Sequence, residues 1–123
     1  MLCITRKKIS APAMNAAIVD SLPGDYGDLP QRIKARAITW RLLTSGREAL
    51  RLALTQGVDL WIINTVLADM SGIDLCRMLK TRSPPPVCYI VTDAYRAEEE
   101  RAARTCGAAL FERKPIRSCW FRT

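Results

Sequence analysis

The sequence predicts an α/β domain, in which helices cover a parallel β-sheet. From Ala16 onward, short apolar runs alternate with amphipathic segments, as strands alternate with helices in such a sheet. The 123 residues, 49% of them hydrophobic, can form one core without a disulfide or metal. No apolar run approaches the roughly 20 residues of a membrane helix. We therefore expect one cytoplasmic domain over residues 15–123, after a basic arm over residues 1–14.

Five apolar runs are the expected strands. The second run carries Arg41 in its middle, with Ile38 and Leu42 among the alternating apolar positions, so we place it at an edge of the sheet. In chain order the runs cover residues 16–19, 38–43, 60–63, 87–91 and 108–111.

Helix signals lie between these runs. Ser45 and Glu48 form a capping box for a helix that Gly57 is expected to end. A second helix is expected to begin near Ser71 and to stop before the three prolines at 84–86.

The sequence signals for the remaining helices differ in strength. Residues 97–106 form a clear third helix, with acidic side chains early and basic ones late. Proline and glycine interrupt the connection between the first two strands and leave a short helix over residues 29–37. Because only eight residues follow Pro115, a final helix should be short or missing. One sheet face is then thinly covered, and Trp120 and Phe121 either fold back over it or contact a partner.

The composition excludes several classes of function. Without histidine, the chain cannot use a Ser-His or Cys-His nucleophile or carry phosphohistidine. Five cysteines without C-x-x-C spacing argue against a zinc site or a disulfide framework. The net charge of +7 allows an acidic partner, but no stacking aromatics accompany the basic residues that would bind nucleic acid. These residues are Arg47, Arg51, Arg77, Lys80 and Arg82.

Polar residues end four of the expected strands. The first strand is followed by Asp20 and Ser21, the third ends at Asn64, the fourth is followed by Thr92, and Lys114 comes shortly after the fifth. Ligands of parallel sheets bind outside the carboxyl ends of the strands. The sequence therefore predicts a polar site at this end of the sheet.

These segments resemble the receiver domain of bacterial two-component response regulators. The resemblance covers residues 16–116 and rests on residues 17–20, 58–64, 69–75, 91–92 and 107–116. It implies a flavodoxin-like (CheY-like), doubly wound, five-stranded parallel sheet in the order 2-1-3-4-5. It also implies a role in phosphorelay signal transduction.

Two departures from the family make this a degenerate receiver. In the family, the third strand ends in an aspartate that accepts a phosphoryl group, and Asn64 stands at that position. A carboxamide is a poor nucleophile, so no acyl phosphate is expected. The family's acidic pair, which helps to hold Mg²⁺, is Asp20-Ser21 here. Because only one carboxylate of the family's set remains, Mg²⁺ binding should be weak or absent.

Other family positions are retained. Thr92 and Lys114 match residues that contact phosphoryl oxygens. Without that group, we expect Lys114 to pair with Asp20 and Asn64 to hydrogen-bond to the pair, and an anion pocket or a water-filled remnant are the alternatives. Asp93 is expected to be a loop or cap residue, and the alternative is that it leans toward the pocket. Phe111 matches the family's switch aromatic and should stay packed in one position, since no covalent input shifts it.

The sequence thus favours a non-phosphorylatable pseudo-receiver that is not an enzyme and uses no cofactor or metal. It would act as a protein–protein interaction module in signalling or transcriptional regulation. Its partner would be another protein or a second copy of itself, and neither nucleic acid nor a membrane is expected. A flavodoxin-like ligand binder or enzyme is one alternative, although no glycine-rich phosphate loop follows the first strand. A basic nucleic-acid-binding module is the other.

Overall fold

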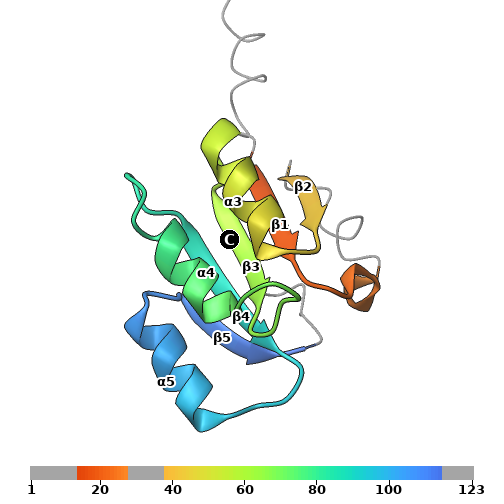
Figure 1. Cartoon of the computed structure of the whole chain (residues 1–123), viewed down its shortest axis with the longest axis vertical. Coiled ribbons are helices and arrows are strands. Elements are labelled where there is room, and N and C mark those ends of the chain that lie inside the picture. The colour runs from red at the N-terminus through yellow and green to blue at the C-terminus, as the bar shows by residue number, and fades with distance from the viewer. Residues whose placement is uncertain (1–13, 28–37, 115–123) are drawn as a thin grey trace, which may run out of the picture.

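The computed structural model describes residues 14–27 and 38–114, which contain a five-stranded parallel sheet (Figure 1). The strand order is β2-β1-β3-β4-β5, as the resemblance implied, and β2 lies at an edge. The strands are β1 (Met14–Val19), β2 (Ile38–Leu43), β3 (Leu60–Asn64), β4 (Val87–Thr92) and β5 (Leu110–Arg113). Within the described ranges, no helix is long and apolar enough to cross a membrane.

Five strand boundaries differ from the prediction by one or two residues: β3, β4 and β5 end later than expected, β1 begins earlier and β5 begins later. Met14, which we assigned to the arm, is the first residue of β1. β5 begins at Leu110 because Ala108 still closes the preceding helix, its N–H donating to the Ala103 carbonyl at 3.0 Å. Gly107 makes that closure with a φ of 97°, a conformation that favours glycine.

The capping box at the start of α3 (Gly46–Thr55) is confirmed. The Ser45 hydroxyl accepts the Glu48 N–H at 3.1 Å, and the Glu48 carboxylate accepts the Thr44 N–H at 2.8 Å. The helix ends at Thr55, before the expected stop at Gly57, because Gln56 already adopts an extended conformation.

The other helices begin as predicted. In α4 (Gly72–Leu79), the Ser71 hydroxyl accepts the N–H groups of the first turn. α4 ends well before the prolines at 84–86, since the Thr81 hydroxyl and N–H both donate to the Met78 carbonyl. α5 covers Ala97–Thr105.

The three α-helices cover the same face of the sheet, and α4 lies between α3 and α5 (Figure 1). Small side chains such as Ala49 and Ala53 let α3 approach the sheet closely. Trp61, only 1% exposed, is the largest side chain buried in this core. Phe111 is also buried there, as expected from the sequence.

The opposite face of the sheet is buried at its centre. Ile18 and Ile62 are fully buried, and Tyr26 from the 3₁₀ turn η1 (Pro23–Tyr26) joins their cluster. The aromatic rings of Trp40 and Tyr89 pack against it. At the edge of the same face, Leu42 of β2 remains 51% exposed, so part of the predicted exposed apolar area is present among the described residues. The predicted arm, the helix over 29–37, and the final segment with Trp120 and Phe121 lie outside them.

Gly72 positions the start of α4 against the end of β3. Its N–H donates to the Thr65 carbonyl at 2.8 Å. A Cβ atom at this position would collide with the Asn64 carbonyl and lie 2.9 Å from the Ile63 side chain. Only glycine therefore allows this approach.

Gly72→Ala should lower the free energy of unfolding by about 3 kcal/mol, because the rigid backbone of β3 cannot yield to the added methyl group. Gly57→Ala is the matched control, since a Cβ there meets nothing within 4 Å. It should change stability by less than about 0.5 kcal/mol in urea unfolding. Equal losses in the two variants would contradict this account of Gly72.

Candidate functional site

A cluster of charged and polar side chains lies at the carboxyl ends of the strands. We call it the strand-end cluster. β1, β3 and β5 bring Asp20, Asn64 and Lys114 to the same end of the sheet, and two loops add three more side chains. Its members are Asp20, Asp25, Tyr26, Asn64, Asp93 and Lys114.

Asp20 is the buried acceptor at the centre of this cluster. Its Oδ1 accepts the Leu22 N–H at 2.9 Å. Its Oδ2 accepts hydrogen bonds from three side chains: the Tyr26 hydroxyl at 2.7 Å, Asn64 Nδ2 at 3.0 Å and Lys114 Nζ at 3.0 Å. Burial opposes ionisation, but these four donors together outweigh it and hold the pKa of Asp20 below its usual value. Asp20 is therefore a carboxylate at neutral pH.

Asn64, the last residue of β3, is 1% exposed, and its amide is fully engaged. Nδ2 donates to Asp20 and, at 3.2 Å, to Asp93 Oδ2. Oδ1 accepts the Val66 N–H at 2.8 Å. A carboxylate in this place could supply no donor to either aspartate. The cluster therefore requires the NH₂ group at position 64.

Lys114 lies among three carboxylates. Its Nζ is 3.0 Å from Asp20 Oδ2, 2.8 Å from Asp25 Oδ2 and 2.8 Å from Asp93 Oδ1. The ammonium group also lies 5.6 Å from the centre of the Tyr26 ring. Burial alone would lower the pKa of Lys114, but the three carboxylates reverse that effect and raise it above the usual value. The lysine is thus fixed as a cation.

The same environment keeps Tyr26 protonated. Burial is the largest cause that raises the pKa of Tyr26, and the hydrogen bond and negative charge of Asp20 add to it. Tyr26 therefore serves as a hydrogen-bond donor to Asp20 and does not act as a base.

The predicted Lys114–Asp20 pair, hydrogen-bonded to Asn64, is present. Besides Asp20, the one remaining carboxylate of the family's set, Asp25 and Asp93 approach from loops and face Lys114. Asp93 is therefore a member of the cluster rather than only a loop or cap residue. The sequence shows both aspartates next to strand ends, but nothing in it tells which way a loop side chain turns.

Three other predicted residues, Thr92, Ser21 and Phe111, stand apart from the cluster's hydrogen bonds. The Thr92 hydroxyl donates to the Ala94 carbonyl at 2.8 Å and accepts from Thr65 at 3.2 Å. Ser21 is exposed. Phe111 packs edge-on against Tyr95, with ring centres 6.0 Å apart. Among the residues described, no group of three or more metal-binding side chains is arranged to hold a metal ion.

A family model for the response regulator receiver domain matches residues 17–119. The chain belongs to the response regulator receiver family. A search of curated proteins finds no significant match to this receiver domain.

Solved structures share the receiver fold at low sequence identity. A CheY-like receiver domain protein from Methanospirillum hungatei is 18% identical, with a TM-score of 0.79 over 88% of this chain and 86% of that one. A response regulator from Burkholderia pseudomallei, solved with a phosphorylated aspartic acid, is 21% identical, with a TM-score of 0.78 over 87% and 63%. The Saccharomyces cerevisiae receiver domain of Ssk1, solved with the histidine phosphotransfer protein Ypd1, is 19% identical, with a TM-score of 0.73 over 86% and 81%.

Lys114→Met should destabilise this receiver domain by about 3 kcal/mol at pH 7, because it leaves the buried Asp20 carboxylate without its cation. The pKa of Asp20 is lowered in the folded wild type, so its contribution holds above about pH 4 and is lost below it. The loss of unfolding free energy in the variant should therefore shrink as the pH falls toward 3. Urea unfolding at several pH values measures this.

Lys80→Met is the matched control, since Lys80 donates to the Pro86 carbonyl and to no carboxylate. Its loss of unfolding free energy should be smaller and should stay constant between pH 7 and pH 3. Equal losses of unfolding free energy in the two lysine variants at every pH would contradict the stabilising role that we give to the strand-end cluster.

Asn64→Asp should also destabilise the domain at pH 7, by about 2 kcal/mol, because a carboxylate would face Asp20 and Asp93 without a donor. The pKa of the new acid is raised by these neighbours, so the loss should disappear as the pH falls and it is protonated. Gln56→Glu adds the same charge at an exposed site and should stay within about 0.5 kcal/mol of wild type. A stable Asn64→Asp variant at pH 7 would contradict the proposed hydrogen-bond geometry.

Proposed function

We propose that this receiver domain is not phosphorylated and works as a protein–protein interaction module. The observation that carries the proposal is the state of Asn64 and Lys114, both of which are already bonded to the domain's own carboxylates. In the family, the equivalent positions accept a phosphoryl group and contact its oxygens. Here, the protein satisfies both groups internally.

The chemistry of Asn64 supports this proposal. An acyl phosphate forms when a carboxylate oxygen attacks phosphorus, and an amide offers no such nucleophile. The Asn64 nitrogen also donates to Asp20 and Asp93, and its oxygen accepts from Val66. Attack on a phosphodonor would therefore need both a poor nucleophile and the loss of three hydrogen bonds.

We further propose that Mg²⁺ binds this site weakly or not at all. Magnesium is held by oxygen ligands, usually carboxylates, in a near-octahedral shell. The three carboxylates of the cluster already surround the ammonium group of Lys114. A metal ion would have to displace this ammonium, which the polypeptide holds in place at the end of β5.

The residues that could transmit a switch are also engaged. Thr92 is bonded to Thr65 and Ala94, and Phe111 is buried against Tyr95. A ligand shifts a conformational equilibrium only if it binds the two states with different affinity. Without a covalent input, we propose that the domain presents one fixed surface.

We propose a protein partner, or a second copy of this chain, as the target of that surface. The Ssk1 receiver domain, which shares this fold, was solved in complex with the protein Ypd1. Among the described elements, α5 and β5 are the surface that we assign to the contact. α5 carries the exposed Glu98 and Arg101, which suit a charged protein surface.

The test is incubation of the full chain with acetyl phosphate and Mg²⁺, followed by intact-mass measurement and light scattering. We expect no added phosphoryl group and the same solution mass with and without the donor. The Ser21→Asp, Asn64→Asp double variant is the matched comparison, because it restores the family's acidic residues. The double variant should gain acid-labile phosphate where wild type gains none.

Phosphate on residue 64 of the wild type would refute the proposal. A change in solution mass that depends on the phosphodonor would also contradict it, because the proposed surface does not switch. If neither protein gains phosphate, residues other than 21 and 64 prevent phosphorylation. That result would overturn the role that we give to Asn64.

A further inference from the structure

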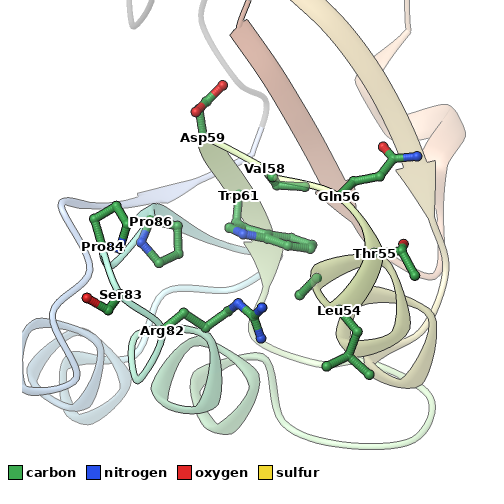
Figure 2. A pocket seen from close by; sticks show the side chains of 12 residues that line it. Leu54, Thr55, Gln56, Val58, Asp59, Trp61, Arg82, Ser83, Pro84 and Pro86 are labelled. Carbon is green, nitrogen blue, oxygen red and sulfur yellow. The ribbon is translucent and has the colours of Figure 1, made fainter.

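A hollow of about 420 Å³ lies where β3 and β4 begin. Figure 2 shows Trp61 in this hollow, between the end of α3 and the prolines of the loop before β4. Gln56 and Asp59 at its rim each accept a hydrogen bond from another part of the domain, and Arg82 is an exposed side chain. These groups therefore do not define a ligand for the hollow.

Three free cysteines of the described residues meet between α4, β4 and α5. We call them the thiol cluster, and its members are Cys76 of α4, Cys88 of β4 and Cys106, which caps the end of α5. Cys76 and Cys88 are fully buried, whereas Cys106 is partly exposed. Because α4 and α5 lie side by side on the sheet, they bring together two cysteines that are 30 residues apart in the sequence (Figure 1).

The sulfur atoms of Cys76 and Cys106 are close enough to form a bond. Cys106 Sγ lies 3.3 Å from Cys76 Sγ and 3.2 Å from the carbonyl oxygen of Ala103, one turn earlier in α5. The S–S bond of a disulfide is about 2.0 Å long, so each sulfur needs to move by only about 0.7 Å. Rotation of the two side chains can supply a shift of this size.

Cys106 is the member of the thiol cluster that an oxidant reaches first, because it is the one with exposed surface. Burial and the hydrogen bond with Cys76 raise the pKa of Cys106 to about 11, although the positive charge of Arg77 opposes them. A hydrogen bond with Cys88 and burial also raise the pKa of Cys76. Since the thiolate is the reactive form, oxidation at neutral pH is slow, and the pair responds to sustained exposure to an oxidant.

We propose that Cys76 and Cys106 form an intramolecular disulfide when the domain reacts with hydrogen peroxide. The peroxide oxidises the Cys106 thiol to a sulfenic acid, and one oxygen of the peroxide leaves as water. The Cys76 sulfur then attacks the Cys106 sulfur, the S–O bond breaks, and the hydroxide leaves with the Cys76 proton as a second water. The two thiols thus give two electrons and two protons to one peroxide. A dithiol reductant reverses the reaction by thiol–disulfide exchange.

The disulfide joins α4 to α5 covalently and closes a loop that contains the whole of β4. A cross-link of this kind restricts the unfolded chain, so the oxidised domain should be more stable than the reduced one. The thiol cluster shares no residue with the strand-end cluster. The inference therefore does not rest on the function proposed above.

The test treats the full chain with millimolar hydrogen peroxide, blocks the remaining thiols with N-ethylmaleimide and maps disulfides by mass spectrometry of a tryptic digest without reductant. Trypsin cuts after Arg77, Arg96 and Arg104, among others, so the three cysteines fall on separate peptides. We expect the Cys76 and Cys106 peptides to be cross-linked within one chain, and dithiothreitol should separate them. The oxidised protein should also unfold at a higher urea concentration than the reduced protein.

Cys106→Ser removes the partly exposed thiol and should lose both the cross-link and the shift in urea midpoint, each variant being compared with its own reduced form. Cys88→Ala is the matched control, because it removes a cysteine of the same cluster that the reaction does not use, and it should keep both. No Cys76–Cys106 cross-link in wild type, a cross-link to Cys88 in its place, or an unchanged midpoint shift in Cys106→Ser would each overturn the proposal. Because no phosphodonor is present, none of these results bears on phosphorylation at residue 64.

Discussion

The charge balance around Lys114 is the constraint on which the rest of this domain depends. The Lys114 ammonium group contacts three carboxylates. They belong to Asp20 at the end of β1, Asp25 in the turn after β1 and Asp93 in the loop after β4. Because Asp20 and Lys114 are both nearly buried, neither can lose its partner without an unpaired charge in the protein interior. The contact therefore ties the first strand to the last across the end of the sheet.

Asn64 fits this charge balance in a way that an aspartate cannot. It adds two N–H donors to a region that is rich in acceptors, and it fixes Val66 in the loop after β3. Asn64 thus stabilises two of the three acidic side chains, Asp20 and Asp93. In the function that we propose, the absence of phosphorylation and the fixed, hydrogen-bonded site both follow from the asparagine at position 64.

Much of the fold could be predicted because its signals are local. Strands appear as apolar runs, and the Ser45 and Ser71 caps appear as residue types at fixed positions. The Lys114–Asp20 pair came from family geometry. The contribution of Asp25 was not predicted and that of Asp93 only as an alternative, because tertiary contacts orient loop side chains. The start of β5 was misplaced because Ala108 is as apolar as a strand residue but serves to end α5.

The most direct test of this account is an NMR titration that follows Asp20 and Lys114 individually through their side-chain carbon shifts. The account predicts that Asp20 titrates below 3.8 and Lys114 above 10.5, their ordinary values. The titration of Asp20 should respond to Lys114→Met, and the titrations of both groups should respond to Asn64→Asp, because Lys114 and Asn64 share contacts at Asp20 Oδ2. An Asp20 carboxyl that titrates at or above 3.8, with a Lys114 amine at or below 10.5, would contradict the central claim that these groups hold each other charged.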